Sequence, residues 1–411
     1  MKKIALLHFA YPPATGGVEI LLQEHALVLT QLGYQVSIFT GSGEEKDPQI
    51  KLTVIPEFQS VMNFNPTLQE KILEKGVIDE EFYQTAKIIG QKLESLLVDQ
   101  DVIIVHNMLT IVRNLPFIEA FRHYVPKHPE KKFIAWVHDH SYIHEFKIKE
   151  LAKVVHSDIE KKLLTTPIDQ ISYVTISETF KKPLVELMNL PSEKVVVIPG
   201  GVLIDKFLEL DESVAAMAED YRLLESFPLL LSPVNILDRK NLDYCLEIVA
   251  NLKKTYPKVC YLVTGNVSRH QSTVEYLQKL KTLIDKLGLK ENVFFLSDHF
   301  HRYLKPSEIH DLYELSDIVL FISKSENFGL PLVESALSKT PIFVSDLAVF
   351  KEIAGNYVNY INYKTTSPQQ AAALIKSFIE KNPYLAAHYH VRTNYSLKRI
   401  LETKLVPLLG G

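Results

Sequence analysis

Two glutamates, Glu326 and Glu334, flank residues 327–331, which read NFGLP. This segment is typical of a loop that turns into a helix, because proline is favoured in a first helical turn. Free N–H groups at a helix start attract anions, and carboxylates accept hydrogen bonds from vicinal hydroxyls. The predicted backbone donors are those of Asn327, Phe328, Gly329 and Leu330. Two glutamates alone would be typical of a solvated surface, but with this loop between them they indicate a site for a nucleotide-sugar.

A second candidate loop contains Gly16 and Gly17, between an apolar run and a helical pattern that ends near Gly33. Glycine lets the backbone approach a ligand closely, and the start of the helix offers N–H groups to an anion. The alternative is a tight turn in which glycine is needed only for positive φ. Both interpretations are open at this point.

Histidines follow two of the predicted strands. His138 ends the run from Phe133, and His106 ends the run before it. Ligands bind at the carboxyl ends of parallel strands, so either His138 or His140 is expected to face a cleft there. His106 is a weaker candidate for the rim of that cleft. The alternative for each of these residues is a core histidine with all its hydrogen bonds made.

Short apolar, β-branched runs alternate with helical patterns along the chain, which predicts two doubly wound α/β domains with parallel sheets. The first series comprises Ile4–Phe9, Val36–Thr40, Val102–His106, Phe133–His138, Tyr173–Ser177 and Val195–Pro199. The second comprises Leu229–Ser232, Cys260–Thr264, Val293–Leu296, Ile318–Ser323 and Ile342–Ser345. Because a Pro-Gly-Gly sequence ends the first series, we expect Rossmann-like domains over 1–203 and 204–390. A C-terminal helix at 391–411 is expected to return to the first domain.

Composition excludes several classes of protein. The 411 residues are 46% hydrophobic and carry a formal charge of −4, which fits two globular cores and argues against a nucleic-acid partner. Two cysteines are too few for a disulfide framework, so a reducing, cytoplasmic location is expected. The N-terminal apolar run lacks a cleavage signal and is expected to be a first strand. No window is apolar enough to span a membrane, and peripheral membrane contact stays open.

Taken together, these motifs resemble glycosyltransferase family 4, the retaining GT-B enzymes, over nearly the whole chain. Further segments similar to the family are Val197–Val202, Val263–Gly265 and Asp311–Asp317. The resemblance implies a GT-B fold with an N-terminal acceptor domain, a C-terminal donor domain and a cleft between them. It also implies a hexosyltransferase-type enzyme that uses a nucleotide-sugar such as a UDP- or GDP-sugar, without a cofactor. The acceptor is a small molecule, glycan, lipid or protein.

The resemblance also implies roles for individual residues. Glu326 would contact hydroxyls of the transferred sugar, and Glu334 would bind the nucleotide ribose. His138 would lie near the reacting face of the sugar, so His138 and Glu326 are the predicted catalytic residues. The loop at Gly16 and Gly17 would approach the donor phosphate and the acceptor.

The chain departs from the family at the diphosphate site. The family has an arginine and, five residues later, a lysine; Lys240 matches the lysine, but Asn235 stands at the position of the arginine. Loss of a fixed cation should weaken stabilisation of the leaving group. Arg239 is a candidate to compensate. However, a side chain next to one in the pocket generally points elsewhere, so Arg239 is expected to be solvated.

The sequence Asp99-Gln100-Asp101 spells the Asp-x-Asp motif of metal-dependent glycosyltransferases. It precedes the strand Val102–His106 and should therefore lie at the end of the sheet opposite to a ligand. We expect no metal site. The charge of the leaving group would be met by Lys240, backbone amides and the helix dipole.

The predicted function is metal-independent, retaining transfer of a sugar from a nucleotide-sugar to an unidentified acceptor. A same-face displacement is favoured, because no carboxylate in these motifs is an evident nucleophile. One alternative is another GT-B enzyme, such as an epimerase, which would turn over donor without an acceptor. The other is a non-catalytic protein that binds nucleotide-sugars, an interpretation that Asn235 favours and that Glu326, Glu334 and Lys240 oppose.

Overall fold

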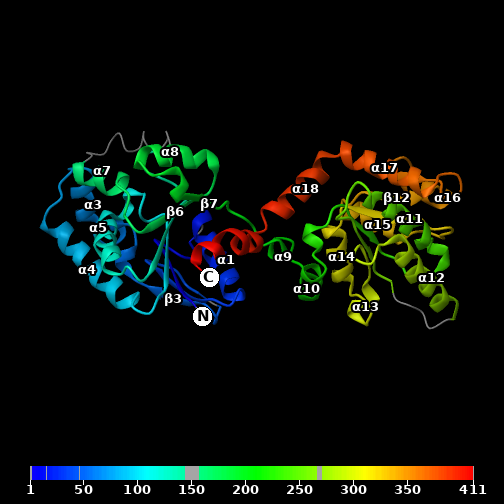
Figure 1. Cartoon of the computed structure of the whole chain (residues 1–411), viewed down its shortest axis with the longest axis horizontal. Coiled ribbons are helices and arrows are strands. Elements are labelled where there is room, and N and C mark those ends of the chain that lie inside the picture. The colour runs from blue at the N-terminus through cyan, green and yellow to red at the C-terminus, as the bar shows by residue number, and fades with distance from the viewer. Residues whose placement is uncertain (1, 15, 46, 144–156, 266–270, 411) are drawn as a thin grey trace. The chain divides into compact units, whose positions relative to one another are not determined.

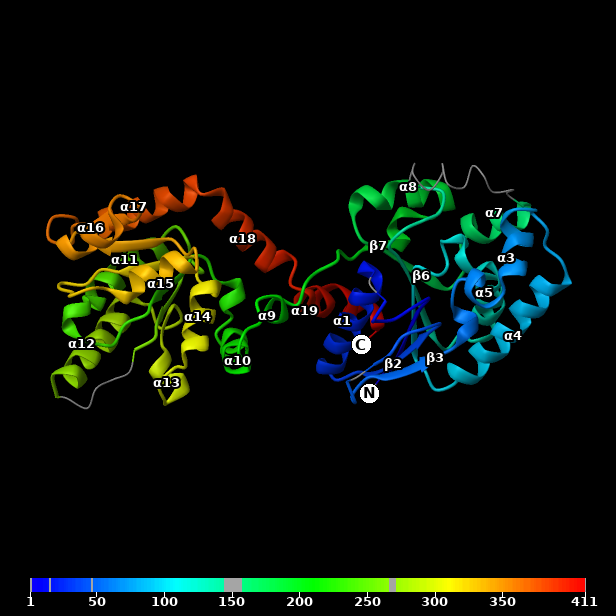
Figure 2. The same ribbon diagram turned by 180° about the vertical axis from the view of Figure 1, so that it is seen from behind.

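The computed structural model describes residues 2–14, 16–45, 47–143, 157–265 and 271–410 (Figures 1 and 2). The chain forms two compact units. The first comprises Met1–Leu203 and Tyr395–Gly411, and the second comprises Ile204–Asn394. The units divide between Leu203 and Ile204, at the boundary expected from the sequence, and the C-terminal return begins at Tyr395.

The first unit contains a seven-stranded parallel sheet in the order β3-β2-β1-β4-β5-β6-β7. Its strands are β1 (Lys3–His8), β2 (Gln35–Thr40), β3 (Lys51–Val54), β4 (Val102–His106), β5 (Lys132–Val137), β6 (Ile171–Thr175) and β7 (Val195–Val197). Its helices are α1 (Gly17–Gln31), α2 (Val61–Phe64), α3 (Pro66–Leu73), α4 (Glu80–Leu96), α5 (Leu115–Tyr124), α7 (Asp158–Thr165), α8 (Glu178–Met188) and the C-terminal α19 (Leu397–Ile400). The helical pattern predicted to end near Gly33 does so, since α1 ends at Gln31 and Gly33 has a left-handed φ of 88°.

Both faces of this sheet are buried, as the continuous apolar strands require. In β1, Ile4 and Leu6 pack into the core that contains α1 and the C-terminal segment. Ala5 and Leu7 pack into the opposite core, with α4, α5 and α7. Successive residues of a strand point to opposite faces, so an uninterrupted apolar run fills two cores. Helices therefore cover the sheet on both sides.

The C-terminal segment is helical, but the single helix expected over 391–411 is wrong. α18 (Pro383–Asn394) belongs to the second unit, and the chain then continues as α19 and two further short helical turns beside α1 (Figure 2). The break has a cause in the backbone. The N–H of Val202 donates to Tyr395 O at 2.9 Å, and Leu397 N–H donates to Val202 O at 3.0 Å. A Cβ on Gly201 would lie 2.9 Å from Tyr395 O, so glycine permits this close approach.

The second unit contains a six-stranded parallel sheet in the order β10-β9-β8-β11-β12-β13. Its strands are β8 (Leu229–Ser232), β9 (Cys260–Val263), β10 (Val293–Phe295), β11 (Ile318–Phe321), β12 (Ile342–Ser345) and β13 (Asn359–Ile361). Its helices are α9 (Ile204–Phe207), α10 (Glu212–Asp220), α11 (Leu242–Lys253), α12 (Gln271–Leu287), α13 (Leu296–Phe300), α14 (Pro306–Leu315), α15 (Leu330–Leu337), α16 (Ala348–Ala354), α17 (Pro368–Lys381) and α18.

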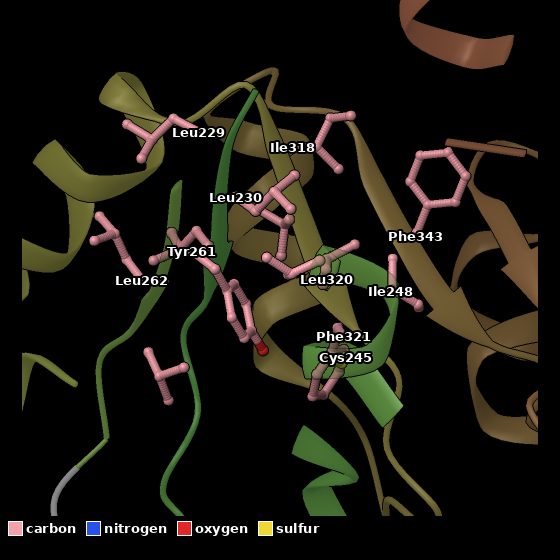
Figure 3. Close-up of a cluster of buried hydrophobic side chains, with 14 of the residues drawn as sticks. Leu229, Leu230, Cys245, Ile248, Tyr261, Leu262, Ile318, Leu320, Phe321 and Phe343 are labelled. Carbon is pink, nitrogen blue, oxygen red and sulfur yellow. The ribbon is translucent and has the colours of Figure 1, made fainter. Parts of the chain in front are cut away.

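The core of the second unit gathers around β8, β9 and β11 (Figure 3). Leu230, Tyr261 and Leu320 come from these three strands and are fully buried. Polar groups inside this core are paired: Ser232 Oγ lies 2.6 Å from Tyr261 Oη and donates to Leu320 O at 2.6 Å. The prediction of two Rossmann-like, doubly wound α/β domains is confirmed. Within the described residues, no helix has the length and apolar character needed to cross a bilayer.

Candidate functional site

A pocket of about 440 Å³ opens in the second unit, among the loops that follow β8, β9 and β11. The carboxyl ends of parallel strands lie at one edge of a sheet, where open α/β sheets bind ligands. The sequence-predicted residues that line the pocket are Asn235, Arg239, Lys240, Glu326, Phe328, Gly329, Leu330 and Glu334. Asn327 is exposed and lies outside this lining. The structure thus brings together eight of the nine predicted residues of this unit.

Lys240 and Glu326 form the central ion pair of the pocket. Lys240 Nζ lies 2.5 Å from Glu326 Oε1, and the two side chains are only 10% and 9% exposed. The ammonium also lies 5.1 Å from the centroid of the Phe321 ring. Burial raises the pKa of the Glu326 carboxyl, but the hydrogen bond from Lys240 and the charges of Lys240 and Arg239 hold it below its usual range. Glu326 is therefore an ionised acceptor inside the pocket.

Arg239 reaches the same carboxylate. Its Nη1 lies 3.2 Å from Glu326 Oε2 and donates to Ser325 O at 3.4 Å. Residues 238–240 form a single 3-10 turn, and Asn241 after it has a left-handed backbone. Arg239 is exposed, as expected, but it does not point away from Lys240, because this tight turn lets the two neighbouring side chains converge on one carboxylate. The pocket has two cations even though position 235 is asparagine.

A second contact ties the loop after β8 to the loop after β11. Lys324 Nζ lies 2.9 Å from Asp238 Oδ2, and Lys324 N–H donates to Arg239 O at 2.7 Å. These bonds lie next to the Arg239–Glu326 contact and fix the position of the two loops relative to each other. The sequence analysis missed this pair, because its partners are far apart along the chain.

Gly329 directly precedes α15 and has φ at +105°, a conformation that other residues rarely adopt. A Cβ at this position would lie 2.6 Å from Phe350 Cε1. Both the backbone conformation and this lack of space therefore favour glycine. The helix starts at Leu330, one residue earlier than expected, and Pro331 takes the second helical position. In the described structure no side chain caps this helix start. Its backbone N–H groups are thus suited to an anionic ligand.

Glu334 lies on α15 and is half-buried at the pocket wall. Its Oε2 accepts a hydrogen bond from Tyr313 Oη at 2.8 Å. Tyr313, on α14, is fully buried, and both burial and the neighbouring carboxylate raise the pKa of its hydroxyl. The phenol therefore remains a neutral donor that orients Glu334. Sequence reasoning missed Tyr313, although it lies inside the segment that resembles the family.

The Gly16–Gly17 loop belongs to the first unit, between β1 and α1. Gly16 has φ at −127°, and Gly17 is not among the residues with positive φ, so the tight-turn interpretation is wrong. A Cβ on Gly16 would lie 2.0 Å from Glu19 Oε2, whereas one on Gly17 would meet nothing within 4 Å. Glu19 folds back over Gly16, but its carboxylate is the end of a flexible side chain that can shift, so this contact alone does not require glycine. Gly17 faces open space, which is compatible with a ligand.

His138 follows β5 in the first unit and is half-buried. Burial, with a smaller effect from His8, lowers the pKa of its imidazole to about 3. Its Nε2 lies 3.1 Å from His106 Nδ1. His140 is the satisfied core histidine, since its two ring nitrogens contact Leu164 O at 3.0 Å and the Tyr142 N–H at 3.1 Å. Of the two histidines predicted to face a ligand after β5, only His138 is partly exposed, so His138 is the better candidate to contact a ligand.

The Asp99–Asp101 motif lies at the amino edge of the first sheet, before β4. Asp101 Oδ2 accepts a hydrogen bond from Lys3 N–H at 2.7 Å, which joins the starts of β4 and β1. His138 lies at the opposite, carboxyl edge. Among the described residues, no group of three or more histidine, cysteine or acidic side chains is arranged to hold a metal ion. The motif has a structural role in the sheet.

Comparison with known proteins shows to which proteins this chain is similar. Residues 215–395 match the family described as glycosyl transferases group 1. The O-antigen chain mannosyltransferase RfbU of Salmonella typhimurium is 27% identical over 213 residues, which is 51% of this chain and 52% of that protein. An uncharacterized glycosyltransferase of Methanocaldococcus jannaschii is 22% identical over 90% of this chain and 87% of its own. A solved glycosyltransferase from Rickettsia africae is 19% identical, with 99% and 98% coverage and a TM-score of 0.36.

The relatives that match this chain are named as glycosyltransferases, and the family match lies in the second unit. More specifically, its second unit carries a group 1 glycosyl transferase domain, since the matched residues span nearly all of Ile204–Asn394. The predicted resemblance is confirmed at this level. The chain spans about half the length of the Salmonella mannosyltransferase that it matches.

Proposed function

We propose that the protein transfers a sugar from a nucleoside-diphosphate sugar to an acceptor, with retention of anomeric configuration and without a metal ion or other cofactor. The donor binds in the pocket of the second unit. The acceptor, a small molecule, glycan, lipid or protein, binds to the first unit near the Gly16–Gly17 loop and His138. The reaction is a same-face displacement in which a phosphate oxygen of the donor takes the proton of the acceptor hydroxyl.

Each group in the pocket has a part in this proposal. The diphosphate lies against the cations of Lys240 and Arg239 and the uncapped start of α15, where positive charge stabilises the leaving group. Glu326 accepts hydrogen bonds from hydroxyls of the transferred sugar, and Glu334 accepts them from the ribose. In the free protein Glu326 pairs with both cations, so donor binding exchanges part of this ion pairing for contacts to phosphate.

A single observation carries the proposal: two cations, two carboxylates and a helix start line one pocket at the carboxyl edge of a parallel sheet. A diphosphate needs the cations and the N–H groups, and a sugar and a ribose need the carboxylates. A site for an anion alone would have no use for Glu326 and Glu334, which would repel it. The combination fits a ligand that carries phosphate and vicinal hydroxyls together.

The test is a thermal-shift screen of the full chain against UDP-, GDP-, ADP- and TDP-sugars, because a ligand of the native state raises apparent stability. The best donor is then assayed for release of nucleoside diphosphate in excess chelator, with and without candidate acceptors. Acceptor-dependent release that survives the chelator supports the proposal. Release of nucleoside diphosphate without acceptor indicates hydrolysis, and conversion of the donor to its epimer without release indicates an epimerase. Loss in chelator that Mg²⁺ or Mn²⁺ restores contradicts metal independence.

A further inference from the structure

Three histidines end three neighbouring strands of the first sheet. His8 closes β1, His106 closes β4 and His138 directly follows β5, and these strands are adjacent in the order β1-β4-β5. His8 Nδ1 lies 2.7 Å from His106 O, and its Nε2 lies 3.6 Å from Glu19 Oε1. At the carboxyl edge of this sheet, His8 thus contacts His106, and His106 contacts His138. The proposed reaction gives a role to His138 alone.

His106 is the buried member of this set that contacts His138. Its side chain is fully buried, and its ring stacks on His138 with centroids 5.4 Å apart and on Trp136 with centroids 5.3 Å apart. Its Nδ1 lies 3.1 Å from His138 Nε2. Its Nε2 is buried and has no hydrogen-bond partner within the described structure. The two rings thus share one hydrogen bond, and among the described residues the His106 ring makes no other hydrogen bond.

These contacts determine which nitrogen of each ring carries hydrogen. Burial lowers the pKa of His106 well below its usual range, and that of His138 to about 3, so both rings are neutral and each carries one hydrogen. If His106 carried its hydrogen on Nε2, a buried N–H would have no acceptor, which is rarer than an unfilled lone pair. The hydrogen therefore lies on His106 Nδ1 and is donated to His138 Nε2. His138 must then carry its own hydrogen on Nδ1.

The backbone next to His106 holds His138 from a second side. Asn107 has a left-handed φ of 61°, which asparagine tolerates, and its N–H donates to Trp136 O at 2.9 Å. Its side-chain Oδ1 accepts hydrogen bonds from the N–H groups of His138 at 3.2 Å and Asp139 at 2.9 Å. The side chain of His138 is therefore anchored by His106, the last residue of β4, and its backbone by Asn107, which follows β4.

We propose that His106 is a positioning residue that holds His138 in the tautomer with hydrogen on Nδ1, so that His138 presents an N–H donor on the side away from His106. This proposal rests on the proposed function only for its consequence in catalysis, which is that a hydroxyl or carbonyl oxygen of a bound sugar accepts from His138 Nδ1. The tautomer itself is a property of the protein alone. Asn107 supports it by fixing the backbone from which the His138 side chain projects.

The tautomer is measured on the full chain without any ligand. Long-range ¹H–¹⁵N NMR spectra of protein labelled in histidine distinguish the ring nitrogen that carries hydrogen from the one that does not. Comparison with His138→Asn assigns the signals of His138. We expect hydrogen on Nδ1 of His138 at neutral pH. Hydrogen on Nε2 in the wild-type protein overturns the proposal, whether or not the protein transfers sugar.

Two variants of His106 separate the donor from the ring. His106→Phe keeps a flat ring for stacking and removes the hydrogen-bond donor, so we expect His138 to change to a mixture of tautomers. His106→Asn retains an N–H donor near the position of Nδ1, so we expect the wild-type tautomer to persist. An unchanged tautomer in a folded His106→Phe variant overturns the proposal. Should that variant fail to fold, the wild-type spectrum and His106→Asn still decide the question.

The consequence for catalysis is tested with the donor identified in the screen. We expect His106→Phe to lower kcat by roughly 10-fold to 100-fold with little change in KM, because a misoriented catalytic group affects the reaction more than binding. His106→Asn should recover most of this loss. Equal losses in both variants would indicate that His106 acts only through packing, and would contradict the positioning role. If no donor is turned over, the proposed function fails while the NMR result stands.

Discussion

Arg239 Nη1 lies 3.2 Å from Glu326 Oε2, while the adjacent Lys240 holds the other oxygen of the same carboxylate at 2.5 Å. In the resembling family the two cations of this region are five residues apart, and here they are consecutive. Asn235 lines the same pocket. The charge missing at position 235 is thus present in the pocket, carried by position 239.

This arrangement predicts that Arg239→Ala weakens binding of the nucleoside diphosphate by about threefold to tenfold, a modest effect because Arg239 is half-exposed and its charge is screened. In that background, Asn235→Arg should restore much of the affinity. In the wild-type protein, Asn235→Arg should lower kcat/KM, since a third long side chain crowds the pocket. Titration calorimetry measures the affinity for the nucleoside diphosphate, and steady-state kinetics measure kcat/KM, for the two single variants and the double variant. A several-fold gain in kcat/KM from Asn235→Arg alone would contradict it.

Glu334 is predicted to bind the ribose. Glu334→Ala should weaken donor binding by about 1.5–3 kcal/mol for each charge-assisted hydrogen bond lost. The matched variant is Tyr313→Phe, which keeps the carboxylate but removes the hydroxyl that orients it, and its loss should be smaller. Titration calorimetry with the nucleoside diphosphate measures both. Wild-type affinity in Glu334→Ala would remove this residue from the site.

The buried histidines predict how the stability of the first unit depends on pH. Burial lowers the pKa of His25 to about 3, from 6.5 in the unfolded chain. Between these values the unfolded chain binds a proton that the native state does not. The free energy of unfolding should therefore fall as pH decreases from 6.5 towards 3, by about 1.4 kcal/mol per pH unit for this histidine.

His25→Phe removes that titration and should make the pH dependence shallower by the same amount. Trp136 is the only tryptophan of the chain, and its ring centroid lies 4.6 Å from that of His25, so its fluorescence reports unfolding of this unit in urea. The control is His123→Phe, which changes an exposed histidine. If the free energy of unfolding depended on pH equally in the wild-type protein and His25→Phe, the prediction that the buried His25 ring stays neutral would be wrong.

The strands were predictable to within two residues because parallel strands buried on both faces are continuous apolar runs. The edge strands β3 and β13 were missed, since each is short and only partly buried. A sequence does not distinguish such strands from loops. Both were added to their sheets only by pairing with β2 and β12.

In the site, the residues that line the pocket could be predicted from the motif, but their contacts could not. The direction of Arg239 depends on a 3-10 turn that composition does not reveal. The Tyr313–Glu334 and His106–His138 hydrogen bonds join elements that only the folded sheet brings together. The roles of the residues that line the pocket and of Gly16, Gly17, Asn327 and His138 stay predictions, as do the metal-independent mechanism and the cytoplasmic location.

The central claim, that the pocket around Lys240 binds the diphosphate of a nucleotide-sugar, is tested most directly by titration calorimetry of the full chain with the nucleoside diphosphate of the best donor. Wild-type protein is compared with Lys240→Ala and with Lys290→Ala, a control at an exposed lysine of the same unit. We predict that Lys240→Ala raises Kd by about 10-fold to 100-fold, through loss of a charge-assisted contact, and that Lys290→Ala leaves Kd unchanged. The same Kd for Lys240→Ala and the wild-type protein would contradict the account.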